Sequence, residues 1–506
     1  MKHFLLACFL MLSIVTIGQR YEVKTLGIIK DQKNTPNLVK YGNRHYGVTN
    51  TAKSKMGWTL KLEKIKYSNK LLAYDEQVNL YKETQIEDGK EAFGPFSSFL
   101  EVINDKLYYI SYNYTESTGI EVSAAETDTT SLKPGPLKKV ITIDQKNVGL
   151  FKIMSLYSSY DFVVKVSPDK SKFLFLWIPG VNETFFFTVT DNKLNKLNSV
   201  SGSIRNAADL LLDNCIIDNA GNFFMAYKYD KKGKYYSGLV TSINGVTKEA
   251  PITLTTGSPH DVYVSHGFAD DHVRVYGTYS DDGYYITGGF SCTVDKKSLL
   301  VKGLLQKPIP ETMMNKFDKD SYAKTKKKDY GVHPEIYFVV KDLDDGNIIM
   351  AGDLIRYQNT GANSMPAAVY GPTLILLISK NDINISRLPK REVGGGNSFY
   401  LHKWGSKAVL LYADLEDNIS KTIDEGEVTH FTSRKNNVVV AAVVENDGRI
   451  SRKILNPNTP GTFYFDPSFA ESIADDAILM GLGKNKLRLT SVRTTSQFYL
   501  IKILDE

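Results

Sequence analysis

The sequence is poor in cysteine. Only 3 cysteines occur among 506 residues, and Cys8 lies in the apolar stretch at the start of the chain. Cys215 and Cys292 remain for everything that follows, which excludes a fold stabilised by a disulfide framework. Because Cys215 lies within an apolar run, we expect two buried thiols, with a disulfide between them as the alternative.

Long apolar runs are also lacking after the N-terminus. A helix that spans a bilayer needs about 20 apolar residues, and no segment after residue 18 provides them, which predicts no transmembrane segment. Residues 1–18 have the form of a secretory signal: Lys2, an apolar stretch over 4–17, and small residues at Thr16 and Gly18. We therefore expect export, with residues 19–506 as the mature protein.

No excess of charge of one sign is present. Lys and Arg together number 62 and Asp and Glu 56, so the net charge is +6, without a dense basic stripe. This balance argues against nucleic acid as a partner. Hydrophobic residues make up 42% and charged residues 23%, which argues against disorder.

Catalytic signatures are missing as well. We find no G-x-S-x-G motif, no P-loop and no dinucleotide-binding glycine pattern. No cofactor is therefore expected. His260, His266 and His272 lie six residues apart, yet no cysteine or carboxylate pattern completes a metal site. We expect these histidines to be ordinary strand and turn residues, and we predict no metal.

Paired carboxylates occur at several turn-like positions, including Asp270-Asp271, Asp281-Asp282 and Asp344-Asp345. Glycoside hydrolysis needs two carboxyl groups about 5 to 9.5 Å apart across a cleft. One sequence does not show which carboxylates face such a cleft, while aspartates at hairpin turns need no functional explanation. Carboxylate catalysis therefore stays an alternative.

What the chain does have is a repeated hairpin, in which a short polar turn precedes a hydrophobic strand. The pattern occurs at 104–112, 168–177, 219–227, 269–279 and 344–352. Repeats of about 40 to 50 residues that each hold several strands are typical of a β-propeller. A ring of such sheets buries both faces of each sheet, which a single sheet does not achieve.

The expected fold is thus an all-β, single-domain β-propeller, with a pair of β-sandwiches as the competing fold. Closed propellers commonly complete their last blade with strands from both termini. We expect seven blades if the termini share one blade and eight if each terminus builds its own, and we favour seven. Residues 310–328 carry Met313, Met314 and Phe317 at helical spacing, which predicts a short helical insertion.

One repeat resembles a known family pattern. Residues 167–175, Ser-Pro-Asp-Lys-Ser-Lys-Phe-Leu-Phe, are similar to the SPDG strand of TolB-like and WD40-like propellers, with Lys170 in place of the glycine. With the segments 107–114 and 370–377, the layout resembles uncharacterised secreted β-propeller proteins of Bacteroidota. This resemblance implies a propeller in the periplasm, at the outer membrane or outside the cell, and it supplies no active site.

The best candidates for binding are loops, because a rigid scaffold commonly carries its binding residues there. Three long or basic loops stand out at 316–330, 358–372 and 387–396. The charged contacts that we predict on them and beside them are Lys326, Lys327, Lys328, Arg356, Lys390 and Arg391.

These observations lead to two functional hypotheses. The favoured one is a non-catalytic scaffold that binds an envelope or outer-membrane protein complex through one rim. The alternative is a glycan-binding or glycan-cleaving propeller that uses acidic and aromatic side chains in its axial tunnel.

Overall fold

The computed structural model describes eighteen segments of the chain. They are residues 20–32, 38–53, 65–92, 97–115, 119–143, 161–178, 184–204, 211–231, 234–267, 271–283, 285–314, 338–358, 367–390, 392–393, 399–419, 437–455, 464–488 and 491–504. The predicted signal segment lies outside them.

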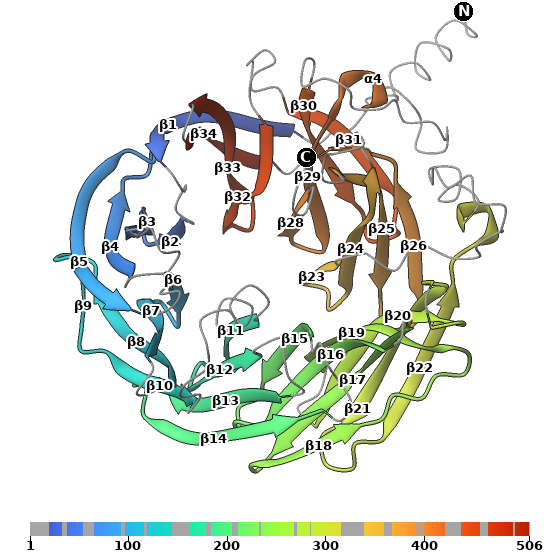
Figure 1. Cartoon of the computed structure of the whole chain (residues 1–506). Coiled ribbons are helices and arrows are strands. Elements are labelled where there is room, and N and C mark those ends of the chain that lie inside the picture. Colours follow the sequence, from blue (N-terminus) through green and yellow to red (C-terminus); the bar gives the residue numbers. More distant parts are fainter. Residues whose placement is uncertain are drawn as a thin grey trace, which may run out of the picture.

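In these segments the chain forms eight antiparallel sheets arranged in a ring (Figure 1), which we number as blades in chain order. Blade 1 consists of β2 (Val39–Tyr41), β3 (Arg44–Lys53), β4 (Ile65–Tyr74) and β5 (Leu80–Ala92). Blade 2 consists of β6 (Ser97–Ile103), β7 (Lys106–Thr115), β8 (Gly119–Asp128), the short β9 (Lys133–Pro134) and β10 (Lys138–Ile143). Blade 3 consists of β11 (Asp161–Val166), β12 (Lys172–Ile178), β13 (Thr184–Asp191) and β14 (Lys196–Ser203).

The next three blades repeat this plan. Blade 4 consists of β15 (Leu211–Ile217), β16 (Phe223–Lys231), β17 (Lys234–Ile243) and β18 (Val246–Ala250). Blade 5 consists of β19 (Ser258–His266), β20 (His272–Ser280), β21 (Gly288–Asp295) and β22 (Val301–Pro308). Blade 6 consists of β23 (Phe338–Asp342), β24 (Ile348–Gln358), β25 (Ala367–Ile378), β26 (Ile383–Leu388) and the short β27 (Glu392–Val393).

The last two blades lead to the C-terminus. Blade 7 consists of β28 (Phe399–Trp404), β29 (Lys407–Leu415), β30 (Asn437–Val444) and β31 (Ile450–Leu455), with the short helix α4 (Glu416–Ile419) after β29. Blade 8 consists of β32 (Tyr464–Ala474), β33 (Ala477–Arg488), β34 (Ser491–Leu504) and the N-terminal strand β1 (Arg20–Gln32).

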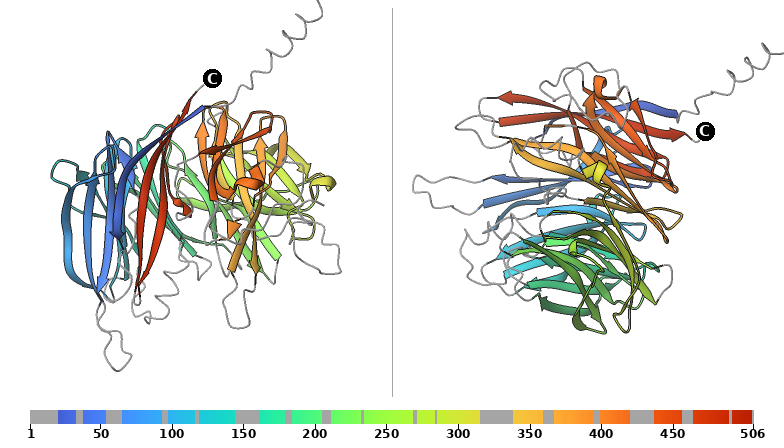
Figure 2. Two further views of the ribbon diagram at one scale, coloured as in Figure 1. Left: turned by 90° about the horizontal axis from the view of Figure 1, so that it is seen from above. Right: turned by 90° about the vertical axis from the view of Figure 1, so that its right-hand side faces the viewer.

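The ring closes where the two termini meet. Strand β1 pairs antiparallel with β34, from Arg20 opposite Leu504 to Gln32 opposite Thr494, and Figure 2 shows the blue and red strands side by side. The termini therefore share a blade, and the blade count is eight, the larger of the two numbers expected. The count exceeds seven because residues 38–92 build a complete blade that does not depend on the C-terminus.

Within each blade the chain runs from the middle of the ring outward, so the first strand is innermost (Figure 1). The second strands are buried on both faces, as in β12, where all residues after Lys172 are buried. Neighbouring blades pack through aromatic and branched side chains. Between blades 3 and 4, for example, the rings of Phe187 and Phe223 lie 4.8 Å apart, centroid to centroid. This burial on both faces explains why strands with this residue content form a ring.

The repeated polar turns are hairpins organised by an aspartate side chain. The Asp191 carboxylate accepts the backbone N–H groups of Lys193 and Asn195 and the Asn195 side-chain amide. Leu194, the residue before Asn195, has a left-handed backbone conformation with φ of 62°. In the SPD turn, Lys170 adopts the same conformation with φ of 59°, which accounts for the glycine that related motifs place there.

The described residues bear on three other expectations. Cys215 and Cys292 are buried free thiols, as predicted. Residues 311–314 form one helical turn, and the rest of the expected insertion lies outside the described segments. In the described part of the chain, no helix has the length and apolar character needed to cross a membrane.

Candidate functional site

Charged and aromatic side chains gather on the innermost strands of several blades. We call Lys40, Glu101, Lys165, Tyr400 and Glu471 the inner-ring cluster. They come from β2, β6, β11, β28 and β32, each of which is the first strand of its blade or, for β32, the innermost strand of blade 8. Segments as distant as residues 40 and 471 therefore contribute to one region.

Hydrogen bonds join two members of the inner-ring cluster across the closure of the ring. The backbone N–H of Lys40 donates to Glu471 Oε1 at 3.2 Å. The Lys40 ammonium group donates to the backbone carbonyl of Ile473 at 3.0 Å. These bonds connect blade 1 with blade 8 and hold the Glu471 carboxyl group against the first blade.

Glu471 has an unusual acid strength. Its pKa is raised from 4.5 to about 7, first by burial and also by the negative charge of Glu101, while the backbone N–H and the charge of Lys40 oppose the shift. Its second oxygen, Oε2, is buried and has no hydrogen-bond partner among the described residues. At neutral pH a large fraction of Glu471 therefore carries a proton, which a carboxylic acid at its ordinary pKa does not.

Glu101 is the second carboxyl group of the cluster. Its side chain is exposed to water, although it lies on the innermost strand β6. The protein around it raises its pKa through desolvation, and the positive charge of Lys165 acts in the opposite direction. Glu101 thus combines access to water with an electrostatic effect on Glu471.

Tyr400 places an aromatic side chain beside Glu471. Its pKa is raised to about 12 by burial and by the charge of Glu471, while a hydrogen bond from the Ser472 backbone lowers it. The phenol therefore keeps its proton at all physiological pH values. The region combines an aromatic side chain, two carboxyl groups and two lysines.

A second group of charges lies on β23, the innermost strand of blade 6, beside β28 of blade 7 (Figure 1). Burial and the positive charge of Lys165 lower the pKa of Lys341 on β23. Burial raises the pKa of the adjacent Asp342, while Arg274, Lys403 and Lys165 lower it. Lys165 thus influences groups from blades 2 and 6, so the inner face of the ring acts as one electrostatic region.

The structure corrects the predicted role of Lys390. Its side chain is buried, and its ammonium group lies 2.8 Å from Asp353 Oδ2. The same nitrogen lies 5.5 Å from the ring centroid of Phe399 and 5.7 Å from that of Tyr412. The prediction of a solvent-facing rim contact is therefore wrong for Lys390, because the chain after β26 passes between blades 6 and 7.

Of the other predicted contacts, the structure describes only the backbone of Arg356. Arg356 lies on β24 opposite Val369. Lys326, Lys327, Lys328 and Arg391 lie outside the described residues.

His260, His266 and His272, the three histidines spaced six residues apart, do not form one site. His260 is buried, and its Nδ1 lies 2.8 Å from Asp261 Oδ2, while Lys228 Nζ lies 2.6 Å from Asp261 Oδ1. His266 lies at the end of β19 and is exposed. A strand histidine and a strand-end histidine are what the sequence predicted for these two.

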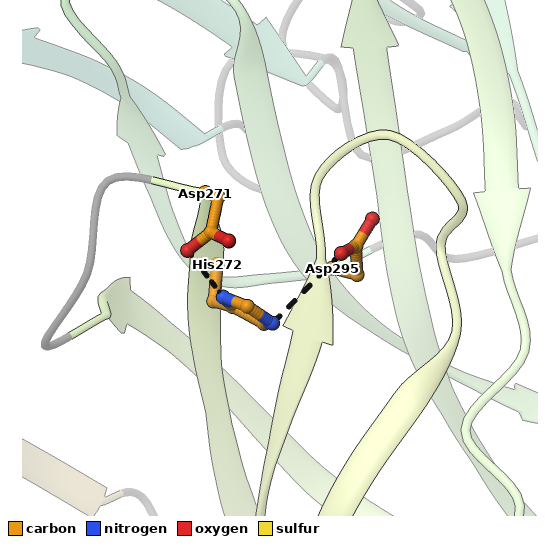
Figure 3. A group of neighbouring side chains, drawn as sticks. All are labelled: Asp271, His272 and Asp295. Atoms are coloured by element: carbon orange, nitrogen blue, oxygen red, sulfur yellow. Dashed lines mark hydrogen bonds and ion pairs between the residues drawn. The ribbon is translucent and has the colours of Figure 1, made fainter.

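His272 belongs to a separate group with Asp271 and Asp295 (Figure 3). Its Nδ1 lies 2.5 Å from Asp271 Oδ1, and its Nε2 lies 3.8 Å from Asp295 Oδ2. Asp295 also accepts the backbone N–H groups of Lys297 and Ser298. Lys302 lies 3.7 Å from the same carboxylate. Asp271, His272 and Asp295 thus bring three possible ligand atoms within 4.8 Å of one another, a grouping that was not predicted from the sequence, and the same contacts organise the hairpin.

Sequence reasoning missed Glu101, Tyr400 and Glu471. It examined aspartate pairs at turns, whereas the two carboxyl groups are single glutamates within innermost strands. A lone charge inside the first strand of a repeat was the available signal, since that strand has apolar neighbours such as Leu100 and Ile103.

Comparisons with known proteins place the chain by fold. No protein-family model and no curated protein matches it. The match with the propeller domain of the trilobed protease from Pyrococcus furiosus covers 87% of this chain and 98% of the protease domain, with 10% identity and a TM-score of 0.36. An α-L-arabinofuranosidase from Fusarium graminearum covers 67% and 93%, with 10% identity and a TM-score of 0.30. An acylaminoacyl peptidase from Pyrococcus horikoshii covers 89% and 58%, with 12% identity and a TM-score of 0.33.

These comparisons contradict the expectation of a non-catalytic scaffold for an envelope protein complex. The similar structures include a protease, peptidases, a puromycin hydrolase, a glycosidase and an alcohol dehydrogenase, together with an uncharacterised protein. Most are named as enzymes, so the scaffold interpretation is set aside. At these identities the likeness shows the fold alone and transfers no activity to this chain.

Proposed function

We propose that this protein is a glycan-active β-propeller that cleaves glycosidic bonds at the inner face of its ring. Glu471 is the general acid and Glu101 the second carboxylate. The observation that carries the proposal is the placement of two carboxyl groups, Glu101 and Glu471, on innermost strands of blades 2 and 8, with Glu471 held by Lys40 across the ring closure. Burial and the charge of Glu101 raise the pKa of Glu471 to about 7, which agrees with this assignment.

Glycoside hydrolysis requires two carboxyl groups whose environments separate their acid strengths. The protonated acid transfers its proton to the oxygen of the departing sugar as the glycosidic C–O bond breaks. The second carboxylate either takes a proton from the attacking water or attacks the anomeric carbon itself. Glu471 suits the first role because it keeps a proton near pH 7, and Glu101 suits the second because water reaches it.

The remaining members of the inner-ring cluster suit a polyhydroxylated substrate. Lysine ammonium groups donate hydrogen bonds to sugar hydroxyls, and an aromatic ring packs against the apolar face of a sugar. Lys165 is half-buried on β11 and Tyr400 half-buried on β28, on strands that border the same region. In this assignment they bind and orient the substrate and do not transfer protons.

The test is a screen of polysaccharides for newly formed reducing ends, with the native sequence and Glu471→Gln compared. We expect the substitution to lower the rate at least about 100-fold, the lower range for a general acid. Binding of the same polysaccharide, measured by affinity electrophoresis, is expected to be unchanged by the substitution. Glu83→Gln is the matched control, because Glu83 is an exposed carboxylate that pairs with Lys70 on the outside of blade 1.

Two results would contradict the proposal. If the native protein releases no reducing ends from any polysaccharide in the panel, the proposal of glycan cleavage is wrong. If the native protein and Glu471→Gln cleave at equal rates, the assignment of Glu471 as the general acid is wrong. The pH profile adds a further check: because the protonated form donates, the rate is expected to fall as the pH rises through about 7.

A further inference from the structure

Large apolar side chains that are exposed to solvent are concentrated at one position of the repeat. Five of them occur in five consecutive blades: Leu80 is 49% exposed, Leu137 45%, Leu197 55%, Val246 56% and Leu300 62%. The other exposed large apolar side chains among the described residues are Tyr81, Tyr236 and Leu504. We call the first five the apolar arc.

Each member of the apolar arc lies within one residue of the first residue of an outer strand. Leu80 and Val246 begin β5 and β18, and Leu197 is the second residue of β14. Leu137 and Leu300 directly precede β10 and β22. All five therefore follow the hairpin that leads into the outer strand, at the same end of the blade.

This equivalence fixes the shape of the surface. Blades of a propeller are related by rotation about the ring axis, so residues at equivalent positions lie at about the same height along that axis. In Figure 1 the outer strands β5, β10, β14, β18 and β22 follow one another around the left and lower sides of the ring. The apolar arc thus follows one rim over blades 1–5.

The arc stops where the ring turns toward its closure. In blade 6 the corresponding residue, Ile383, is buried. In blade 7 the corresponding residue, Ile450, is only partly exposed and packs against the neighbouring core. Exposure of a large aliphatic side chain at this position is therefore not a general consequence of propeller geometry.

Exposed lysines accompany the apolar arc. Lys133, Lys193, Lys196, Lys248 and Lys297 are exposed and lie within four residues of an arc member in the sequence. None of these five forms an ion pair with another residue in the described segments. By the same measure the acidic residues beside the apolar arc are Glu76, Glu83 and Glu249. Glu83 pairs with Lys70, and Glu249 accepts a hydrogen bond from the Tyr227 hydroxyl. Lysines thus outnumber carboxylates along the arc.

We propose that this rim binds the surface of an anionic lipid bilayer, with the apolar arc entering the interface and the lysines contacting lipid headgroups. Apolar side chains flanked by basic ones are the combination that holds proteins at anionic membrane surfaces. An arc of separate side chains along one rim suits a bilayer better than a protein partner, which needs a contiguous, closely packed patch. The proposal does not depend on glycan cleavage.

The test measures co-sedimentation of the full chain with vesicles of phosphatidylcholine containing 30% phosphatidylglycerol. We expect binding to these vesicles, at least tenfold weaker binding to pure phosphatidylcholine, and a clear loss in 0.5 M salt because screening weakens the headgroup contacts. Replacing Leu137, Leu197, Val246 and Leu300 together by serine is expected to weaken binding at least tenfold. Replacing Lys133, Lys193, Lys196 and Lys248 by glutamine is expected to remove most of the salt dependence.

Tyr236→Ser and Leu504→Ser together are the matched control, since they remove exposed apolar side chains outside the arc, and binding is expected to stay within twofold. All variants change exposed side chains, and circular dichroism melting confirms that they fold. Failure of the native protein to bind anionic vesicles would overturn the proposal, as would unchanged binding of the serine variant. Concentration-dependent dimerisation that the serine substitutions abolish, without vesicle binding, would assign the rim to a second copy and overturn it equally.

Discussion

Burial decides what a charged side chain does at the scale of single residues in this protein. Lys390 belongs to a basic sequence motif, yet it lies in the core between blades 6 and 7 with Asp353. Glu471 is an ordinary glutamate in sequence, yet its surroundings make it a weak acid near neutral pH. Each of these states has a consequence for stability that a substitution measures.

For Glu471 the consequence is a dependence of stability on pH. The pKa of Glu471 in the folded state, about 7, lies above the ordinary value of 4.5. The contribution of the protonated carboxyl group to the free energy of unfolding is therefore complete below pH 4.5 and is lost as the pH rises through 7. Glu471→Gln removes this loss. Relative to the native protein, the variant is expected to gain on the order of 2 to 3 kcal/mol between pH 4.5 and pH 8, at about 1.4 kcal/mol for each pKa unit.

Urea unfolding at these two pH values measures the gain for Glu471→Gln. An equal effect of the substitution at both pH values would show that the carboxyl group has an ordinary pKa, whatever the protein acts on.

For Lys390 the consequence is a large cost of removing one partner of a buried pair. Lys390→Met leaves the Asp353 carboxylate without its ammonium partner and is expected to lower the free energy of unfolding by about 3 to 5 kcal/mol. Lys139→Met is the control, because the Lys139–Glu121 pair has a largely exposed lysine and is worth about 0 to 1 kcal/mol. Chemical denaturation at pH 7 distinguishes the two, and similar small losses would place Lys390 at the surface.

At the scale of elements, close contacts between strands limit which residues the sheets accept. Gly277 on β20 is an example, since a Cβ atom there would lie 1.9 Å from the backbone carbonyl oxygen of Asp261 on β19. The contact involves backbone, so no side-chain rotation relieves it. This glycine is required by the approach of two strands and not by a turn.

Gly277→Ala is therefore expected to destabilise the protein by about 3 kcal/mol, the upper part of the range of about 1 to 3 kcal/mol for inserting an atom into a filled core. At Gly135 the nearest atom to an added Cβ is the Glu126 carbonyl oxygen at 3.4 Å, so Gly135→Ala is expected to change stability by no more than about 1 kcal/mol. Thermal melting of both variants provides the comparison. A mild effect at Gly277 would mean that β19 and β20 separate easily.

At the scale of the whole molecule, closure of the ring combines the two termini. Strand β1 supplies the outer strand of blade 8, and Lys40 bonds to Glu471 and Ile473 on the inner side of the same closure. The closure thus supports the ring and also positions the carboxyl group to which we assign proton transfer.

Deletion of residues 1–32 removes β1 and leaves the edge of β34 unpaired. We expect the melting temperature to fall by at least about 5 °C, together with association of molecules through the free strand edge. Deletion of residues 1–19, which keeps β1, is the control and is expected to leave both properties unchanged. Melting curves and size-exclusion chromatography measure them, and equal behaviour of the two deletions would show that β1 does not close the ring.

The sequence by itself determined the class of fold. Alternating apolar residues, aspartate turns such as 167–172 and the recurrence of this hairpin are local features, and local patterns set strands and turns. Burial of Cys215 and Cys292 as free thiols was likewise predictable, because each cysteine lies in an apolar strand. The blade count stayed open between seven and eight, since the pairing of β1 with β34 joins residues at opposite ends of the chain.

Only the tertiary structure decided the candidate site and the apolar arc. Glu101 lies about 300 residues before Tyr400, and Glu471 lies 71 residues after it. Their common property is a place on the innermost strands of different blades. The members of the apolar arc become a surface only because rotation of one repeat brings equivalent positions to one rim. In both cases the relevant quantity is desolvation or exposure in three dimensions, which depends on packing between blades that no local pattern contains.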